Sequence, residues 1–291
     1  MTPATDRSLL RLALPKGRMQ DEVFLLLAEA GIRVRLGTRG YRPSIALPGC
    51  QAKLLKPQNI IEMLHAGSRD VGFAGADWVA ELGADVTEIL DTGLDPVRLV
   101  AAAPHALLED GRLPPRRLVV ASEYERLTSD WIARRGLDAT CIRSYGATEV
   151  FPPEDADLIV DNTATGATLE ANDLTVVDDL LCSTTRLFAH PRALDDPRRR
   201  EAIDRLAMLL QSVLDARRRV MLEVNVTAER LEAVCAMLPC MREPTISSLH
   251  GGAGYAVKAA VPHADLALLI PRVKAAGGAD IVVTALSHIV A

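Results

Sequence analysis

The sequence has few aromatic residues and no long uninterrupted apolar run. Aromatic side chains make up only 3% of the residues although 49% are hydrophobic, so we expect a core built from aliphatic side chains. No apolar run is long enough to span a bilayer, and the polar residues 1–8 with the short apolar segment after them do not form a signal peptide. These absences predict a soluble cytoplasmic protein that does not bind membranes.

The chain also lacks an excess of positive charge. Its formal net charge is −5 and its pI is about 5.7, which argues against a general nucleic-acid-binding protein. A length of 291 residues is sufficient for more than one domain and a sizeable core.

Cysteine and histidine are not spaced for metal binding or disulfide formation. The five cysteines are odd in number and include no CxxC pair, so we expect reduced, mostly buried thiols rather than a disulfide framework or a zinc site. No two of the six histidines share a helical metal-ligand spacing. A nucleophilic triad cannot be assembled from the spacing either.

The most informative stretch is 157–169, which predicts a strand, a loop and the start of a helix. The apolar run ends at Asp161, and a loop of small and hydroxyl residues follows. Backbone N–H groups and threonine hydroxyls in such a loop predict an anion site. An acid beside it that accepts hydrogen bonds from hydroxyls, or holds hydrated Mg²⁺, suggests a sugar phosphate. The alternative is an ordinary strand-to-helix turn, because short motifs also match by chance. The loop residues are Thr163, Ala164, Thr165, Gly166, Ala167 and Thr168.

Two other turns nearer the start of the chain have suitable chemistry. Lys16 and Arg18 follow the first predicted strand, at the edge where open α/β sheets place ligands, and two cations suit an anion. Residues 70–78 form a second strand–loop–helix unit in which Gly72 and Gly75 allow close approach to the backbone. The alternatives are solvated surface charges in the first turn and glycines required only for packing in the second.

Predicted strands and helices alternate, which favours a mostly parallel sheet. Two pairs of predicted strands have no helix between them, namely 86–90 with 97–103 and 174–181 with 186–190. We expect the chain to cross between subdomains there. Residues 53–56 are expected to form an irregular segment.

The last part of the chain reads as a separate module. A helix with an Asp-Pro start, over 195–218, joins it to the rest. From Val220 onward the expected order is β-α-β-β-α-β, the ferredoxin-like arrangement. Pro271 should kink the second helix or delay its start. No loop in this module has residues suited to catalysis, so a regulatory or assembly role is favoured.

Taken together, these stretches resemble the long form of the ATP phosphoribosyltransferase family of histidine biosynthesis. The resemblance extends from Leu10 to Val290. It is most specific at 12–18 and at 159–161 followed by 165–172. Further support comes from 70–78 and, in the last module, from 231–234, 244–247 and 274–277.

The resemblance implies a reaction and a set of roles. N1 of the ATP adenine would attack C1 of the ribose in phosphoribosyl pyrophosphate, and Mg²⁺ would neutralise the leaving pyrophosphate. Asp161 would be the catalytic residue, and Asp70 and Asp161 would hold the metal. Catalysis would rest on positioning and electrostatics, because adenine N1 is already a nucleophile. The implied substrate-binding residues are Lys16, Arg18, Asp70, Gly75, Glu149, Thr163, Ala164, Thr165, Gly166, Ala167 and Thr168.

The same resemblance implies an α/β architecture and a form of control. A bilobal catalytic part like a periplasmic binding protein would have one lobe from 1–96 and 181–215 and the other from 97–180. A ferredoxin-like regulatory domain would span 216–291. The protein would be a homo-oligomer between dimer and hexamer, inhibited by histidine bound near Asn225 and Thr245.

Three segments depart from the family pattern. Residues 48–57 differ from the usual arginine-bearing segment, 95–98 replace a glycine- or cysteine-bearing turn, and 250–254 loosen the regulatory hairpin. The competing hypotheses are a non-catalytic bilobal small-molecule-binding or regulatory module and a catalytically inactive paralogue. The lack of a signal peptide and of a helix-turn-helix argues against the first. The intact loop after Asp161 argues against the second.

Overall fold

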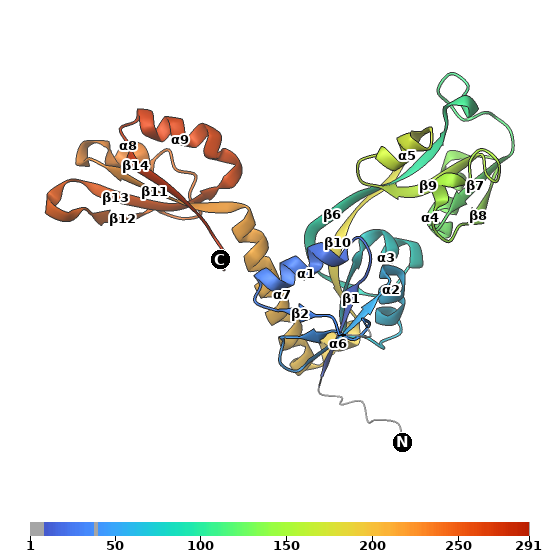
Figure 1. Cartoon of the computed structure of the whole chain (residues 1–291), viewed down its shortest axis with the longest axis horizontal. Coiled ribbons are helices and arrows are strands. Elements are labelled where there is room, and N and C mark those ends of the chain that lie inside the picture. Colours follow the sequence, from blue (N-terminus) through green and yellow to red (C-terminus); the bar gives the residue numbers. More distant parts are fainter. Residues whose placement is uncertain (1–8, 38–39, 291) are drawn as a thin grey trace. The chain divides into compact units, whose positions relative to one another are not determined.

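The computed structural model describes residues 9–37 and 40–290, which divide into two compact units (Figure 1). The first unit contains the described residues up to Leu25 together with Ile32–Asp204. The second contains Leu26–Gly31 and the described chain from Arg205 onward. Helices α1 (Gln20–Glu29) and α7 (Pro197–Arg217) therefore contribute to both units.

The first unit is organised around one mixed sheet, whose described strands follow the order β4-β1-β5-β10-β6-β9-β7-β8. The strands are parallel within the group β4-β1-β5 and within the group β9-β7-β8, but the pairings that involve β10 and β6 are antiparallel. The expected parallel sheet is therefore found only within each end group. The strands are β1 (Leu10–Pro15), β4 (Cys50–Leu55), β5 (Val71–Gly75), β6 (Thr87–Pro104), β7 (Leu118–Ser122), β8 (Ala139–Arg143), β9 (Leu158–Thr163) and β10 (Leu174–Ala189), and β2 (Val34–Arg35) pairs separately with β3 (Ser44–Ile45).

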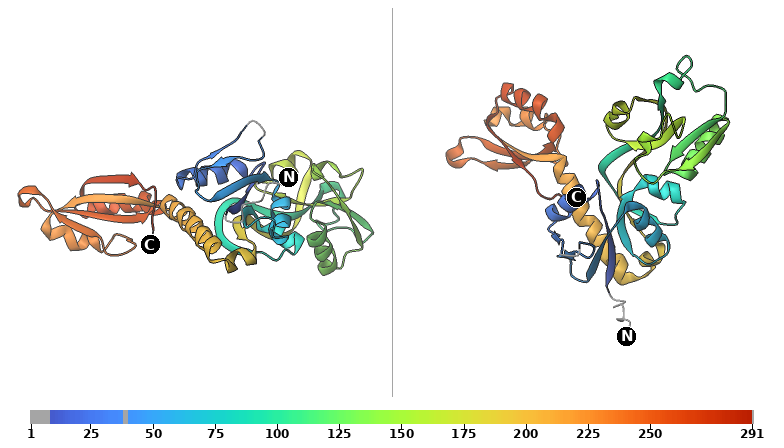
Figure 2. Two further views of the ribbon diagram at one scale, coloured as in Figure 1. Left: turned by 90° about the horizontal axis from the view of Figure 1, so that it is seen from below. Right: turned by 45° about the vertical axis from the view of Figure 1, so that its right-hand side comes forward.

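The long strands β6 and β10 lie side by side and link the two end groups (Figure 2). The sequence predicted two strands in place of each, and this prediction was wrong. Pairing continues through the expected breaks because register shifts absorb the extra residues, as β-bulges do. In the break of β6, Gly93 and Asp95 take left-handed backbone conformations with φ of 66° and 46°.

Strand β4 also differs from its prediction. The segment expected to be irregular contains Lys53, which lies inside β4 and pairs with β1. Ala52 and Leu54 are buried and alternate with the more exposed Gln51 and Lys53. This is the period-two pattern of a strand at the edge of a sheet, with one face covered.

The helices of the first unit cover the end groups. Helix α2 (Pro57–His65) begins with proline at its first position and buries Ile60, Ile61 and Leu64. Gly72 permits this packing, because a Cβ at that position would come within 2.8 Å of Ile60 Cγ2. The other helices are α3 (Ala76–Leu82), α4 (Glu125–Arg135), α5 (Ala167–Ala171) and α6 (Pro191–Asp195), with short turns η1 (His105–Leu107) and η2 (Thr148–Val150).

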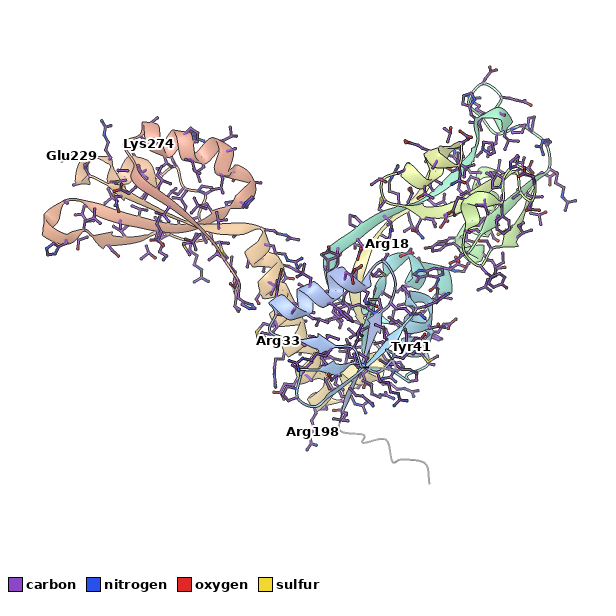
Figure 3. The ribbon with its side chains drawn as sticks, in the orientation of Figure 1. Arg18, Arg33, Tyr41, Arg198, Glu229 and Lys274 are labelled. Atoms are coloured by element: carbon purple, nitrogen blue, oxygen red, sulfur yellow. The ribbon has the colours of Figure 1, made fainter. Side chains whose placement is uncertain are left out.

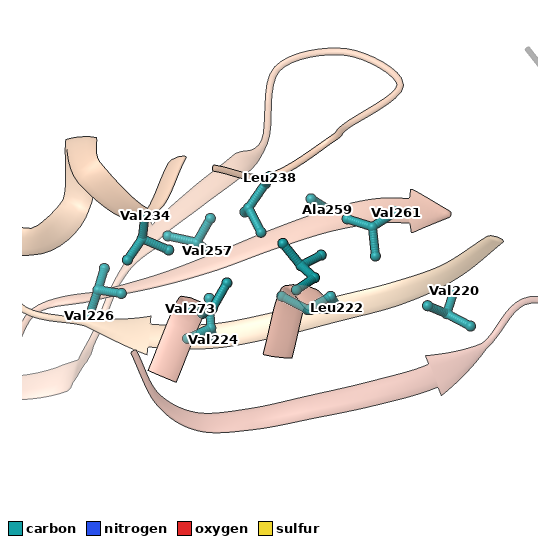
Figure 4. Close-up of a cluster of buried hydrophobic side chains, with 11 residues drawn as sticks. Val220, Leu222, Val224, Val226, Val234, Leu238, Val257, Ala259, Val261 and Val273 are labelled. Carbon is teal, nitrogen blue, oxygen red and sulfur yellow. The ribbon is translucent and has the colours of Figure 1, made fainter. Parts of the chain in front are cut away.

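Apart from its parts of α1 and α7, the second unit contains an antiparallel sheet in the order β12-β13-β11-β14 and the helices α8 and α9. Every second residue of β11 is buried, and these valines and leucine belong to the core cluster drawn in Figure 4, to which α8, β13 and α9 also contribute. The element order is the one the sequence predicted, and Pro271 lies inside the second helix. The elements are β11 (Arg219–Val226), η3 (Ala228–Arg230), α8 (Leu231–Cys235), β12 (Thr245–Ser248), η4 (His250–Gly252), β13 (Tyr255–Pro262), η5 (His263–Asp265), α9 (Leu266–Ala275) and β14 (Ala279–Ala285). Within the described ranges, no helix combines the length and apolarity needed to cross a membrane.

Candidate functional site

A cavity of 230 Å³, which we call the loop cavity, opens beside the loop between β9 and α5. Gly166 is the N-cap residue of α5 and has a φ of 87°, a conformation that favours glycine. The Thr163 hydroxyl accepts a hydrogen bond of 3.0 Å from the Gly166 N–H, and the Thr165 hydroxyl accepts one of 3.3 Å from the Ala167 N–H. These bonds fix the shape of the loop. The cavity is lined by Arg18, Glu149, Asp161, Asn162, Thr163, Ala164, Thr165, Ala167, Thr168 and Leu169.

Asp161 is the acid of the loop cavity whose pKa departs from its ordinary value. Its carboxylate accepts a hydrogen bond of 2.7 Å from the Asn162 backbone N–H. Burial, reinforced by the negative charges of Glu123 and Glu149, nevertheless raises the pKa of Asp161 to about 6. Because burial and like charge disfavour the ionised carboxylate, the site favours a ligand that brings a cation or develops positive charge.

A second cavity of 390 Å³, which we call the central cavity, shares Arg18 and Asn162 with the loop cavity. Part of its lining comes from the carboxyl ends of parallel strands in both end groups, the edge where such sheets bind ligands, and part comes from β6 and β10. Lys16 follows β1 and Gly75 ends β5, whereas Glu123 follows β7. Figure 3 labels Arg18 where the two groups face each other. The cations on the lining are Lys16, Arg18 and Lys56, and the acids are Asp77, Asp95 and Glu123.

A buried hydrogen-bond network crosses the central cavity from one end group to the other. The Asp77 carboxylate accepts hydrogen bonds of 2.6 Å from the Tyr124 and Ser183 hydroxyls. The Tyr124 oxygen in turn accepts a hydrogen bond of 3.0 Å from the Asn162 side chain. The Tyr124 ring also stacks on Trp78, with the ring centroids 4.5 Å apart. The network holds the side chain of Asn162, the residue that follows Asp161 in the sequence.

The structure brings together most of the residues that the sequence singled out. Lys16 and Gly75 line the central cavity, and Arg18 lines both cavities. Glu149, Asp161 and the loop threonines line the loop cavity, and Gly166 supplies its turn. A side chain at Gly75 would overlap the Asp77 carboxylate, which explains the glycine.

Asp70 is not brought to either cavity. It precedes β5, whereas Gly75 at the other end of that strand lines the central cavity, which places Asp70 roughly 16 Å away. Its side chain is 1% exposed and pairs with Arg11 at 2.6 Å and with Arg199 at 3.1 Å. The expectation that Asp70 binds substrate and metal therefore gives way to a structural role for this residue. A strand motif alone does not show which end of the strand faces the ligand.

Four buried or half-buried polar residues of the network were missed as site residues: Asp77, Tyr124, Asn162 and Ser183. Asp77 lies in the 70–78 segment, but its partners are 47 and 106 positions away in the sequence. One available signal was position, because Tyr124 and Asn162 stand at the carboxyl ends of predicted strands.

The two residues expected to contact histidine lie in the second unit. Asn225 donates a hydrogen bond of 3.0 Å to Asp280. Thr245 pairs with Lys258 and lines a cavity of 670 Å³. The strand register places Asn225 and Thr245 on the same face of the sheet, opposite the buried core of Val224 and Val257.

Comparison with known proteins covers both units. A family model described as ATP phosphoribosyltransferase matches residues 56–212, and one described as HisG, C-terminal domain, matches residues 216–288. The chain is 38% identical over 288 residues to the ATP phosphoribosyltransferase of Pelotomaculum thermopropionicum, a match that covers 97% of this chain and 99% of the relative. It is 36% identical over 280 residues to the ATP phosphoribosyltransferase of Chlorobium phaeobacteroides, with 94% of this chain and 95% of the relative covered.

One solved structure shares the fold of a large part of the chain. It is the ATP phosphoribosyl transferase (HisG:HisZ) complex from Thermotoga maritima, with a TM-score of 0.63 and 24% sequence identity. The match covers 71% of this chain and 99% of that chain. At this identity the similarity concerns the fold alone.

Proposed function

The chain belongs to the ATP phosphoribosyltransferase family, and we propose that its loop cavity and central cavity bind the two substrates of that reaction. The enzyme is a glycosyltransferase of the first step of histidine biosynthesis. It transfers the phosphoribosyl group of phosphoribosyl pyrophosphate to N1 of ATP and releases pyrophosphate. The observation that carries the proposal is that Arg18 and Asn162 line both cavities, which places the two binding sites next to each other.

We assign phosphoribosyl pyrophosphate to the loop cavity. The loop from Thr163 to Thr168 offers backbone N–H groups and hydroxyls to the 5-phosphate. Asp161 faces the ribose, where it accepts hydrogen bonds from the hydroxyls. Its negative charge then stabilises the positive charge that develops on the ring in the transition state. Glu149 lies on the same cavity and adds to this field.

We assign ATP to the central cavity, whose lysines and arginine suit a triphosphate. Lys16, Arg18 and Lys56 approach from one end group. The adenine then lies toward Asn162 and the loop cavity. N1 forms a bond to C1 of the ribose as the bond from C1 to the pyrophosphate oxygen breaks. No base is needed to activate N1, so the residues act by holding the two substrates in line.

Mg²⁺ fits this site as an ion shared with the substrate. Among the described residues, no cluster of three or more His, Cys, Asp or Glu side chains is arranged to hold a metal on its own. Asp161, with its raised pKa, and Glu149 would contribute carboxylates to an ion that also binds substrate phosphates, as Mg²⁺ commonly does. When bound, the ion would neutralise the leaving pyrophosphate.

We further assign the first unit to a bilobal arrangement like that of periplasmic binding proteins, with the lobes at 1–96 with 181–215 and at 97–180. The two end groups linked by β6 and β10 support this assignment. The order β12-β13-β11-β14, with α8 and α9 packed against one face, supports a ferredoxin-like regulatory domain over 216–291.

Histidine would bind this domain near Asn225 and Thr245 and inhibit a homo-oligomer of up to six chains. The support is that both residues lie on the face of the sheet that carries the 670 Å³ cavity. We expect histidine to lower the initial rate and Thr245→Ala to weaken this inhibition. Thr140→Ala, at an exposed strand position of the first unit, is the control. Insensitivity of the parent enzyme to histidine would refute the regulatory part of the proposal.

The test of the catalytic proposal is an omission assay. Purified protein with Mg²⁺ is supplied with ATP, with phosphoribosyl pyrophosphate, or with both, and pyrophosphate is measured. We expect release only when both substrates are present. Binding of either substrate without release would instead support a non-catalytic module, and release without ATP would indicate simple hydrolysis.

A further inference from the structure

Tyr145 is the most exposed large hydrophobic side chain in the described part of the chain. It is 84% exposed, yet it lines the central cavity. A tyrosine ring left in water forgoes the favourable burial of its apolar surface, and a ligand that covers the ring recovers it. Because only 3% of the residues are aromatic, an exposed aromatic ring on the lining of a cavity indicates a ligand contact.

The loop that carries Tyr145 is fixed on both sides of the residue. The Ser144 backbone N–H donates a hydrogen bond of 3.0 Å to the Ser122 carbonyl. The Ser144 and Thr148 hydroxyls are hydrogen-bonded at 2.7 Å, and both residues are buried. The exposed ring is therefore held out by an anchored backbone rather than by a loose one.

One face of the Tyr145 ring already has a neighbour. The Arg143 guanidinium carbon lies over the ring, 5.3 Å from its centroid, in a cation–π contact. The high exposure of the side chain leaves the opposite face available. The other aromatic rings of the cavity, Trp78 and Tyr124, stack on each other, and Tyr124 is fully buried. Tyr145 is thus the ring of this cavity that a planar ligand can cover.

The same short loop serves both cavities. Tyr145 lines the central cavity, and Glu149, four residues later, lines the loop cavity. A planar group held against Tyr145 would therefore lie close to the proposed ribose site. This is the placement that an adenine needs if its N1 is to reach C1 of the ribose.

We propose that Tyr145 is the residue that recognises the purine of ATP, by stacking the free face of its ring on the adenine. The proposal rests on the assignment of ATP to the central cavity. Stacking selects a flat aromatic base and sets its plane, while the triphosphate is held by the cations of the other end group. Tyr145 therefore contributes to the affinity for ATP and not to the affinity for phosphoribosyl pyrophosphate.

The test compares steady-state constants for the two substrates in the full-length enzyme. Tyr145→Ala should raise KM for ATP by about 5- to 100-fold, the range expected for loss of one base–aromatic stack. KM for phosphoribosyl pyrophosphate should stay within about two-fold. Tyr145→Phe keeps the ring and should restore KM for ATP, whereas Tyr145→Leu keeps apolar bulk without the ring and should resemble alanine. Leu268→Ala removes another highly exposed apolar side chain, from α9, and should change neither constant.

The outcomes separate this proposal from the one it rests on. A parent enzyme that shows no turnover refutes the catalytic assignment. With an active parent, an unchanged KM for ATP in Tyr145→Ala and Tyr145→Leu overturns the stacking role. An equal rise in both KM values also overturns it, because it indicates a general loss of site structure. So does a fall in oligomeric mass with KM for ATP unchanged, because the ring would then serve contact between copies of the chain.

Discussion

Tyr124 donates a hydrogen bond of 2.6 Å to the carboxylate of Asp77, and this bond joins the two end groups of the eight-stranded sheet. Both residues are buried. Burial, followed by the negative charge of Asp77, raises the pKa of Tyr124, so the phenol stays protonated and remains a donor. Its oxygen also holds Asn162, the neighbour of Asp161.

Tyr124→Phe removes this link. The change leaves the buried Asp77 carboxylate and the Asn162 amide each short of a partner, so we expect the free energy of unfolding to fall by about 1–3 kcal/mol. Turnover should also fall, because Asn162 loses its support. Tyr41→Phe, at an exposed position, is the control and should change neither quantity. If Tyr124→Phe is as stable as the parent in urea denaturation, the bond does not contribute to the free energy of unfolding.

Asp70→Asn tests the structural role assigned to that residue. Breaking the pairs of this buried carboxylate with the half-buried Arg11 and Arg199 should lower the free energy of unfolding by about 3 kcal/mol. The dependence of the rate on Mg²⁺ should not change in the fraction that folds. Asp179→Asn breaks an exposed pair with Arg98 and should cost less than about 1 kcal/mol. If the Mg²⁺ dependence of the rate shifts in Asp70→Asn and not in Asp179→Asn, Asp70 contributes to metal binding.

Asp161 should make the enzyme less stable as pH rises through the acidic range. Its folded pKa of about 6 lies above the ordinary value of 3.8, so the folded protein binds the proton more tightly than the unfolded chain. Stability therefore falls between about pH 4 and pH 6. Asp161→Asn should be more stable than the parent near neutral pH, by on the order of 3 kcal/mol.

The measurement is urea denaturation of both proteins across that pH range. The advantage of Asp161→Asn should shrink toward the acidic end. In the parent, kcat/KM should fall as pH drops below about 6, because the carboxylate is then protonated. A stability difference that is independent of pH would contradict the assignment of the raised pKa to this residue.

Gly166→Ala tests the loop conformation. No atom lies within 4 Å of a Cβ placed there, so the change introduces backbone strain at φ 87° without a clash. We expect a cost of about 1–2 kcal/mol in stability and a raised KM for phosphoribosyl pyrophosphate, with KM for ATP much less affected. Gly136→Ala is a matched control, because its φ is 63° and its Cβ would also meet open space at the end of α4. If the two variants change KM for phosphoribosyl pyrophosphate equally, the loop does not bind the phosphate.

Local patterns in the sequence were enough to predict many of the residues that line the two cavities. The apolar run before Asp161 and the small residues after it predicted a strand and a ligand loop, because burial and glycine freedom act within a few residues. The same holds for Lys16 and Arg18 after β1 and for the element order of the second unit. These features depend on spacing along the chain, which a sequence displays directly.

The parts that were missed depend on contacts between distant residues. The bonds of Asp77 to Tyr124 and Ser183 span 47 and 106 positions, and no local pattern signals them. Asp70 was misplaced because its partners Arg11 and Arg199 come from other elements. The single strands β6 and β10 were read as pairs because bulges preserve their pairing across residues that ordinarily end a strand.

Asp161 is the carboxylate that we place beside the reacting ribose, and one measurement tests this placement most directly. The rate of pyrophosphate release by Asp161→Asn is compared with that of the parent at saturating Mg²⁺, ATP and phosphoribosyl pyrophosphate near neutral pH. We predict a fall of at least about 100-fold in a variant that stays folded and still binds phosphoribosyl pyrophosphate. A rate close to that of the parent would contradict the account.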